Sequence, residues 1–467
     1  MPTNSDQPDG SASPTVEWIV TTQSAAWQAQ PALATTGLEG MPDVMVSPVA
    51  AGQIIDGIGC CFNELGWTAL ELLTEEERAA ILHDLFAPGA GTNFTLCRMP
   101  IGANDFSRNW YSYDETDGDF ELHDFSITQD HETLVPFIRA AQGHQPQLRL
   151  WASPWSPPTW MKVNRHYAGA LPWPGSGVDN GLRPDQVGRE GTDMFVLDDR
   201  HLGAYARYFA RFVEAYRAEG IEVEMVMPQN EFNSAQVFPS CTWTPEGLAR
   251  FIAVLGPEMA ELGVKVFFGT QERPHASHLE TVLADPDAGR YVAGAGFQWA
   301  GKGAVAPAHW AHPELPLYQT EQECGDGRND WRFCRYTWTL MRHFFASGAR
   351  AYMYWNMALT EGGVSRWGWA QNSLVVVDPE TRAWRYTPEY YLMRHLGHFL
   401  QPGARVIATA SWTGFENQLA FANPDGTVVV VMQNDLAEPL QVRIAIGDRV
   451  VTPTLPADSF ATFVRRP

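Results

Sequence analysis

The chain has 467 residues, of which 45% are hydrophobic and 18% are charged, so its composition is that of a globular protein rather than a disordered one. Its formal net charge of −22 repels phosphate groups, which argues against a nucleic-acid-binding protein. No run of about 18 apolar residues occurs, so we expect no stable insertion into a membrane.

The first 50 residues divide into two parts. Residues 1–14 are polar and predict a flexible segment without the basic start and apolar stretch of a signal peptide. We therefore expect either a cytoplasmic protein or a secreted or periplasmic one whose leader has been removed. Residues 15–50 contain short β runs such as VEWIVTT and DVMVSP, which we expect to pair with strands from the other end of the chain.

Residues 51–403 predict a (β/α)₈ barrel. Short apolar runs alternate with helical patterns, and each run is apolar nearly throughout, as expected of parallel strands buried on both faces. A doubly wound sheet would instead require a Gly-rich phosphate loop after its first strand, and GIGCCF does not provide one. The eight runs cover residues 54–62, 94–101, 147–153, 223–229, 264–270, 291–299, 317–321 and 350–356.

Two helices can be placed between these runs with some detail. Residues 201–220 carry aromatic and aliphatic side chains on one stripe, and Gly220 suits the C-terminal cap. Residues 244–263 predict a second helix, with Thr244 as N-cap and Pro245 at the first helical position.

Residues 404–467 predict an antiparallel β-sandwich. Alternating runs such as TVVVVMQN and LQVRIAIG are separated by the turn sequences PDG, GD and PAD. With the strands of residues 15–50, they would form a small domain built from both ends of the chain.

Six cysteines are present, but none forms a CxxC pair and no histidine cluster accompanies them. This pattern predicts neither a zinc site nor a disulfide scaffold, although one incidental disulfide stays open. We expect no metal and no organic cofactor.

Polar residues at the ends of two predicted strands indicate the chemistry. The fourth run ends in Gln229-Asn230-Glu231 and the seventh in Thr320-Glu321. Carboxylates at these strand ends would face each other across the barrel mouth, where one can protonate a glycosidic oxygen and the other can attack the anomeric carbon. Asn230 could hydrogen-bond the sugar 2-hydroxyl. Glu323, two residues beyond Glu321, is the competing candidate.

Further candidates end other runs. Arg98 lies near the end of the second run and Asp105 follows that run; a buried pair of this kind is either structural or a reader of sugar hydroxyls. Trp155 after the third run and Trp355 in the eighth could stack on a sugar ring or fill the core. The 18 tryptophans of the chain fit either reading.

From about residue 50 to the end, the sequence resembles glycoside hydrolase family 30. The resemblance rests on several sequence motifs, called blocks here, which include MPQNEFNSAQVFPSCTWTPEG and LYQTEQECGDGRNDW. Their ordered combination is far more specific than any one block. The blocks span residues 98–127, 152–164, 227–252, 317–331, 354–378 and 386–407.

The resemblance implies a (β/α)₈ barrel with an attached β-sandwich and a retaining mechanism without cofactors. Glu231 would be the acid/base and Glu321 the nucleophile, and Arg98 would support the nucleophile region. The implied contacts to the bound sugar are Asp105, Trp155, Asn230 and Trp355.

Two segments differ from glucosylceramidase-like members of the family. Gln298-Trp299 stands where those members carry His followed by Trp, and residues 366–373 also differ. We count Gln298 among the expected substrate contacts. Asp105 favours a sugar with a free 4-/6-hydroxyl edge, hence glucose.

The sequence therefore predicts a carbohydrate as the binding partner and a β-glucosidase or β-1,6-glucanase as the activity. Two alternatives remain. The same machinery could act as a β-xylosidase, β-fucosidase or glucosylceramidase, or the chain could be a non-catalytic carbohydrate-binding protein. The oligomeric state is not indicated.

Overall fold

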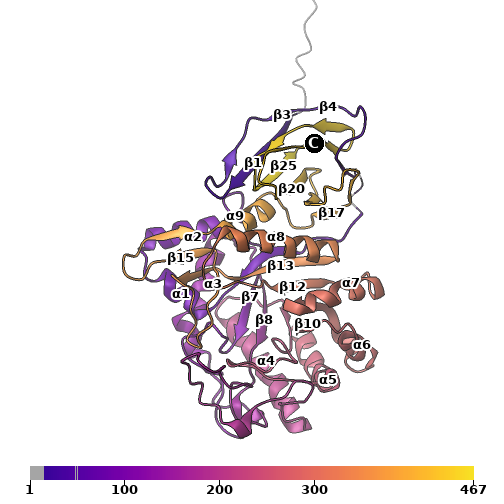
Figure 1. The fold of residues 1–467 in the computed structure, drawn as a ribbon. Coiled ribbons are helices and arrows are strands. Elements are labelled where there is room, and N and C mark those ends of the chain that lie inside the picture. The colour runs from indigo at the N-terminus through magenta and orange to yellow at the C-terminus, as the bar shows by residue number, and fades with distance from the viewer. Residues whose placement is uncertain (1–14, 48, 50) are drawn as a thin grey trace, which may run out of the picture. The chain divides into compact units, whose positions relative to one another are not determined.

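The computed structural model describes residues 15–47, 49 and 51–467 (Figure 1). The chain separates into two compact units, one of Gln53–His398 and one that combines Met1–Gly52 with Phe399–Pro467. The predicted flexible segment 1–14 lies outside the described residues. In the part of the chain that the structure describes, no helix is both long enough and apolar enough to cross a membrane.

The unit Gln53–His398 contains the predicted barrel. Within its described residues, eight parallel strands close into a ring, and β13 pairs with β6 to complete it. β9 is only two residues long, so residues 229–231 lie on the loop that follows it rather than on a strand. The strands are β6 (Gly57–Cys61), β7 (Leu96–Ile101), β8 (Arg149–Pro154), β9 (Met225–Val226), β10 (Lys265–Gln271), β11 (Val292–Gln298), β12 (Leu317–Glu321) and β13 (Ala349–Asn356).

Helices alternate with these strands and surround the barrel (Figure 1). Both helices predicted from the sequence are present. The first, α4, begins two residues earlier than expected. The second, α5, is capped by Thr244, whose side chain accepts a hydrogen bond from Gly247 N at 2.9 Å. The helices are α1 (Glu64–Leu70), α2 (Glu75–Phe86), α3 (Leu134–His144), α4 (Asp199–Ala218), α5 (Pro245–Glu261), α6 (Ser277–Ala284), α7 (Lys302–Ala311), α8 (Trp331–Ala346) and α9 (Pro388–Gly397).

Side chains from β7, β8, β9, β10, β12 and β13 fill the interior of the barrel. The buried cluster consists of Leu96, Trp151, Met225, Met227, Phe267, Tyr318, Ala351 and Met353. Because the interior is packed, a ligand has to bind at the mouth, where the loops after the strands project. The loop after β13 adds a small sheet of β14 (Ala358–Thr360), β15 (Val375–Val377) and β16 (Trp384–Tyr386).

The second unit is a β-sandwich built from both ends of the chain, as predicted. β1 pairs antiparallel with β25, which lies beside it in Figure 1. β5 pairs with β18 and β22, and its pairing with β22 is parallel, a departure from the antiparallel expectation. One sheet has β17 (Arg405–Ile407), β19 (Gln418–Ala422), β20 (Val428–Asn434), β25 (Ser459–Arg465), β1 (Thr15–Thr22), β2 (Gln28–Ala29) and β3 (Leu33–Ala34). The other has β18 (Thr409–Ser411), β5 (Val44–Val46), β22 (Ile444–Ile446), β23 (Arg449–Val451) and β4 (Thr36–Gly37).

The alternating pattern of these strands places one face of each sheet in a shared core. β1 buries every second residue from Val16 to Val20, and Trp18 stacks on Phe463 with ring centroids 5.4 Å apart. Val44 and Ile444 of the second sheet belong to the same buried cluster. The N-terminal strands are therefore part of the sandwich core. A further pair of short strands, β21 (Leu440–Gln441) and β24 (Thr454–Leu455), completes the unit.

Candidate active site

Glu231 lies on the loop after β9 with an unusual backbone conformation. Its φ is 47°, in the left-handed region that residues with a Cβ rarely adopt. Neighbouring strands hold it there, since its N–H donates to Thr270 Oγ1 at 2.9 Å and the N–H of Asn230 donates to Pro154 O at 2.7 Å. Strained backbone of this kind concentrates at functional sites. The side chain of Glu231 is 7% exposed.

Glu321 is the last residue of β12 and is 6% exposed. Three N–H donors converge on its carboxylate. Arg98 Nη1 donates to Oε2 at 2.7 Å, Gln298 Nε2 donates to Oε2 at 3.1 Å, and Trp299 Nε1 donates to Oε1 at 3.0 Å. Hydrogen bonds to a carboxylate favour its charged form, and those from a guanidinium are the strongest.

Arg98 connects several strands beneath this site. Its guanidinium is fully buried and donates to Ser153 Oγ at 2.9 Å and to Asn230 Oδ1 at 2.7 Å, besides Glu321. Its Cζ lies 4.3 Å from the ring centroid of Trp155, so the charge is also stabilised by an aromatic face. The arginine therefore fixes side chains from β7, β8 and β12 and from the loop after β9 in one network.

One amide nitrogen links the two glutamates. Gln298 Nε2 lies 3.2 Å from Glu231 Oε1 and 3.1 Å from Glu321 Oε2. Thr320 Oγ1 donates to Gln298 Oε1 at 2.9 Å, which orients the amide so that its nitrogen faces the carboxylates. The two carboxyl groups are thus neighbours, and each is within hydrogen-bond distance of the same atom.

Burial and mutual repulsion raise the pKa values of the acidic groups. Burial raises the pKa of Glu231 well above its usual range, and the charges of Glu321 and Glu272 raise it further. Burial also raises the pKa of Glu321, but here Arg98 is the largest opposing influence. For Asp105, burial and then the charge of Glu321 raise the pKa well above its usual range.

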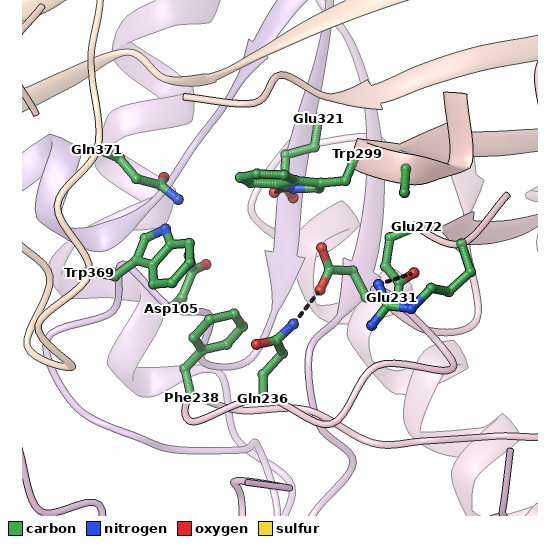
Figure 2. A pocket seen from close by; sticks show the side chains of 11 residues that line it. Asp105, Glu231, Gln236, Phe238, Glu272, Trp299, Glu321, Trp369 and Gln371 are labelled. Carbon is green, nitrogen blue, oxygen red and sulfur yellow. Dashed lines mark hydrogen bonds and ion pairs between the residues drawn. The ribbon is translucent and has the colours of Figure 1, made fainter. Parts of the chain in front are cut away.

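A cavity of about 220 Å³ lies at the ends of these strands (Figure 2). Both glutamates line it, together with further charged, polar and aromatic side chains. Its ionisable lining residues are Asp105, Glu231, Glu272, Arg273 and Glu321. The other lining residues are Gln236, Phe238, Trp299, Ala300, Trp369 and Gln371.

The expected site residues occupy two layers. Asp105, Glu231 and Glu321 line the cavity itself. Behind them are the other five, all buried: Arg98, Trp155, Asn230, Gln298 and Trp355.

The two expected stacking tryptophans lie in the rear layer. Trp155 and Trp355 are each 1% exposed and stack on each other, with centroids 5.4 Å apart. Neither is among the residues that line the cavity. In this structure their faces contact Arg98 and each other, so they support the site from behind.

Glu323, the competing candidate, lies outside the cavity lining. Its Oε1 is 2.7 Å from Lys302 Nζ, and its Oε2 accepts a hydrogen bond from Tyr336 OH at 2.8 Å. Both oxygens therefore have partners of their own. The structure brings Glu321, and not Glu323, together with Glu231.

Sequence reasoning missed several lining residues, although signals for some were present. Trp299 adjoins Gln298, and Trp369 and Gln371 fall in the segment 366–373 that departs from glucosylceramidase-like members. Glu272 directly follows β10, so the strand-end rule applied to the fifth run would have found it. Of the remaining missed residues, Gln236, Phe238 and Arg273 lie on loops, and Ala300 lies in the short 3-10 helix Trp299–Gly301 that follows β11.

The described residues offer no group of three or more His, Cys, Asp or Glu side chains placed to hold a metal ion. All six cysteines are free and buried. The arrangement at the cavity is a pair of adjacent buried carboxyl groups with unlike hydrogen-bond donors. Such a pair can combine an acid with a nucleophile or base.

Comparison with known proteins gives matches along most of the chain. The lysosomal acid glucosylceramidase of Mus musculus is 27% identical over 450 residues, which cover 90% of this chain and 83% of that protein. The endo-1,6-beta-D-glucanase of Neurospora crassa is 27% identical over 426 residues, covering 85% and 82%. The crystal structure of SrfJ from Salmonella typhimurium has a TM-score of 0.84 at 24% identity, covering 97% of this chain and 100% of that one.

Family profiles match both units. The TIM-barrel domain of glycosyl hydrolase family 30 matches residues 55–400, and the beta-sandwich domain of the same family matches residues 403–463. Together they cover the closed barrel and the C-terminal strands of the sandwich. The protein is thus a glycoside hydrolase, and it belongs to glycosyl hydrolase family 30.

Proposed function

We propose that the protein hydrolyses β-glucosidic bonds with retention of anomeric configuration, through a covalent glucosyl-enzyme intermediate. The observation that carries the proposal is the pair of glutamates joined by Gln298 Nε2, with an arginine on only one of the two carboxylates. Neighbouring carboxyl groups suit the spacing of about 5–5.5 Å found in retaining enzymes better than the wider spacing of inverting ones.

Glu321 is the proposed nucleophile. A nucleophilic carboxylate must be ionised, and the guanidinium of Arg98 at 2.7 Å favours the charged form. The N–H groups of Trp299 and Gln298 add to this stabilisation. In the first step, a Glu321 oxygen forms a bond to the anomeric carbon as the bond from that carbon to the leaving oxygen breaks.

Glu231 is the proposed acid/base. Its carboxyl oxygens accept hydrogen bonds from amides, Gln236 Nε2 at 3.3 Å and Gln298 Nε2 at 3.2 Å, and amides favour the charged form less than a guanidinium does. With burial and two acidic neighbours raising its pKa, it holds a proton that it can give to the leaving oxygen.

The proton returns in the second step. Once Glu321 is esterified its negative charge is gone, so the pKa of Glu231 falls and the group can act as a base. It takes a proton from water as the water oxygen bonds to the anomeric carbon and the bond to Glu321 breaks. Both glutamates are then restored to their starting protonation states.

Two buried side chains provide contacts for the sugar. Asn230 Oδ1 accepts from Arg98 and from Thr270 Oγ1, which leaves the Nδ2 donors for a sugar hydroxyl such as the 2-hydroxyl. Asp105 lines the cavity and, within the described residues, its buried Oδ1 has no hydrogen-bond partner, so it can accept from hydroxyls. Trp369 and Phe238 supply aromatic surface in the same cavity.

Two further observations support glucose as the sugar. The cavity volume of about 220 Å³ is below the roughly 300–1,000 Å³ of pockets for drug-sized ligands and suits a ligand as small as a sugar ring. The relatives reported above are named for glucosylceramide and for 1,6-β-glucan. We therefore propose that the substrate is a β-glucoside or a β-1,6-glucan.

The test combines labelling of the nucleophile with product analysis. A 2-deoxy-2-fluoroglucosyl fluoride should add one fluoroglucosyl unit to the intact protein, and fragment spectra should place it on Glu321. Proton NMR should show the β-anomer as the first product from an aryl β-glucoside. A label on Glu323, or α-anomer as the first product, would refute the mechanism.

The same preparation can then be assayed on β-1,6-glucan, an aryl β-glucoside and an aryl β-xyloside. A ladder of oligosaccharides would indicate cleavage within chains, whereas glucose alone would indicate cleavage at chain ends. Faster cleavage of the xyloside than of the glucoside would contradict the choice of sugar.

A further inference from the structure

The cavity has a third buried glutamate that the proposed mechanism does not use. Glu272 follows β10, lines the cavity with Glu231, and its side chain is 1% exposed. Within the described residues, neither of its carboxylate oxygens accepts a hydrogen bond of regular geometry, although Ser234 and Arg273 lie near enough to favour its charged form. A buried acceptor without such a partner is uncommon in proteins, and at the wall of a cavity it is available to a ligand.

Arg273 holds this carboxylate in place from one side. Its Nη1 lies 3.0 Å from Glu272 Oε2, and its Nη2 lies 2.6 Å from Glu190 Oε1. Two carboxylates therefore share one guanidinium, so the charge of Glu272 is only partly compensated. Burial raises the pKa of Glu272 to about 7 while Arg273 opposes the rise. Near neutral pH the group can thus pair with a hydroxyl either as acceptor or, when protonated, as donor.

The position of Glu272 indicates which part of a substrate it would meet. Figure 2 shows Glu231 between Asp105 on one side and Glu272 on the other. The acid/base must contact the oxygen that joins the sugar to its leaving group. If Asp105 reads the sugar that becomes attached to the enzyme, a leaving group extends past Glu231 toward Glu272.

We propose that Glu272 hydrogen-bonds hydroxyl groups of the leaving group, an inference that rests on the proposed function. The enzyme would then prefer glucosides whose leaving group is another sugar. Polar and charged side chains, Gln236 and Arg273, line the cavity with it. The hydroxyl groups of a sugar ring can donate hydrogen bonds to the carboxylate oxygens of Glu272, whereas an alkyl chain would cover these oxygens without supplying a donor.

The test compares three substrates at the pH of maximal activity of each variant. A glucosyl disaccharide has a hydroxylated leaving group, octyl β-glucoside has an alkyl one that also needs protonation, and an aryl β-glucoside has an activated one. For Glu272→Gln we expect kcat/KM to fall about tenfold with the disaccharide, and for Glu272→Met about a hundredfold. With the other two substrates, changes should stay below about threefold.

Octyl β-glucoside separates this role from an effect on the proton of Glu231. If kcat/KM falls equally for the disaccharide and octyl glucoside while kcat/KM for the aryl glucoside is unchanged, Glu272 acts through Glu231 and the proposal is wrong. It is equally wrong if the disaccharide shows no loss, or if wild-type enzyme cleaves octyl glucoside faster than the disaccharide. Glu323→Gln, which removes a partly buried carboxylate outside the cavity, is the matched control and should change none of the three rates.

A binding measurement keeps this inference independent of turnover. In Glu321→Gln protein, calorimetry should show that adding Glu272→Met weakens disaccharide binding at least tenfold and leaves glucose binding unchanged. Equal weakening of both ligands would contradict a leaving-group contact. The two proposals can therefore fail separately. If wild-type protein cleaved no glucoside but Glu272→Met still weakened disaccharide binding, the proposed reaction would be wrong and the proposed binding contact would be right.

Discussion

The end of β12 and the loop after β9 each carry a glutamate at nearly the same burial, yet the surroundings of the two side chains differ. Glu321 is 6% exposed and accepts from a guanidinium, an indole and an amide. Glu231 is 7% exposed and accepts from two amides, with acidic neighbours on both sides. Burial alone would raise both pKa values, so the donors decide which carboxyl group is ionised first. Identical residues thereby receive opposite roles in the proposed mechanism.

Of the substitutions at these two glutamates and their donors, Glu321→Gln should lower activity most, because it removes the proposed nucleophile. We expect kcat to fall by at least about 10⁴-fold for disaccharide and aryl substrates alike, since no covalent intermediate can form. Steady-state hydrolysis assays measure kcat with both substrates. Glu323→Gln should keep activity within about threefold, as its carboxylate lies outside the cavity. An active Glu321→Gln beside an inactive Glu323→Gln would reverse the assignment.

Glu231→Gln should separate substrates by leaving group. We expect disaccharide cleavage to fall by about 10²–10⁴-fold, because the leaving oxygen needs a proton. A dinitrophenyl glucoside leaves without one, so its first step should survive and release a burst of phenolate before slow turnover. Stopped-flow absorbance records the burst. Equal losses with both substrates would show that Glu231 does not serve as the acid.

Arg98→Met should make the two carboxylates more alike. Burial raises the pKa of Glu321 and Arg98 opposes this rise, so removing the guanidinium should raise that pKa further. Because Glu321 must be ionised, the acid limb of the kcat/KM profile should move to higher pH. An unmoved limb would show that the guanidinium does not set the ionisation of Glu321.

Removing one partner of a buried pair also destabilises the fold, by about 3–5 kcal/mol. Thermal unfolding of Arg98→Met must therefore accompany its pH profile. Arg98→Lys provides the second variant. It keeps the charge without the forked geometry, and should return part of the acid limb toward its wild-type position.

Trp299→Phe should have the smallest effect of the series. It removes the indole N–H that donates to Glu321 Oε1 at 3.0 Å and keeps an aromatic ring. This hydrogen bond lowers the pKa of Glu321, so its loss should shift the acid limb upward, by less than the loss of the Arg98 guanidinium does. We expect kcat/KM to fall by about three- to tenfold. A downward shift of the limb would contradict the role given to the indole.

The barrel and the two glutamates could be predicted because both follow from one regularity. Buried parallel strands leave apolar runs in the sequence, and their carboxyl ends meet at one mouth. Counting the runs therefore placed Glu231 and Glu321 at the same end of the barrel. A different pattern, the alternation of apolar and polar residues between turn sequences, predicted that the N-terminal and C-terminal strands form a separate sandwich.

The layers of the site could not be predicted in this way. Trp155 and Trp355 also follow or end strands, and nothing in their spacing shows that they pack behind the cavity on Arg98. Phe238, Trp369 and Gln371 come from loops, whose paths depend on packing rather than on periodicity. Cavity shape, and with it substrate preference, is set by these segments.

The left-handed backbone at Glu231 has a consequence for the engineering of this enzyme. A residue with a Cβ pays about 1–3 kcal/mol to hold such a conformation, and glycine does not. Trp299, with φ also 47°, adds a second position of this kind beside the cavity. Selection for thermal stability alone would therefore favour glycine at position 231 and discard the group proposed to carry the proton. Thermostable variants of this enzyme should be screened for turnover from the first round.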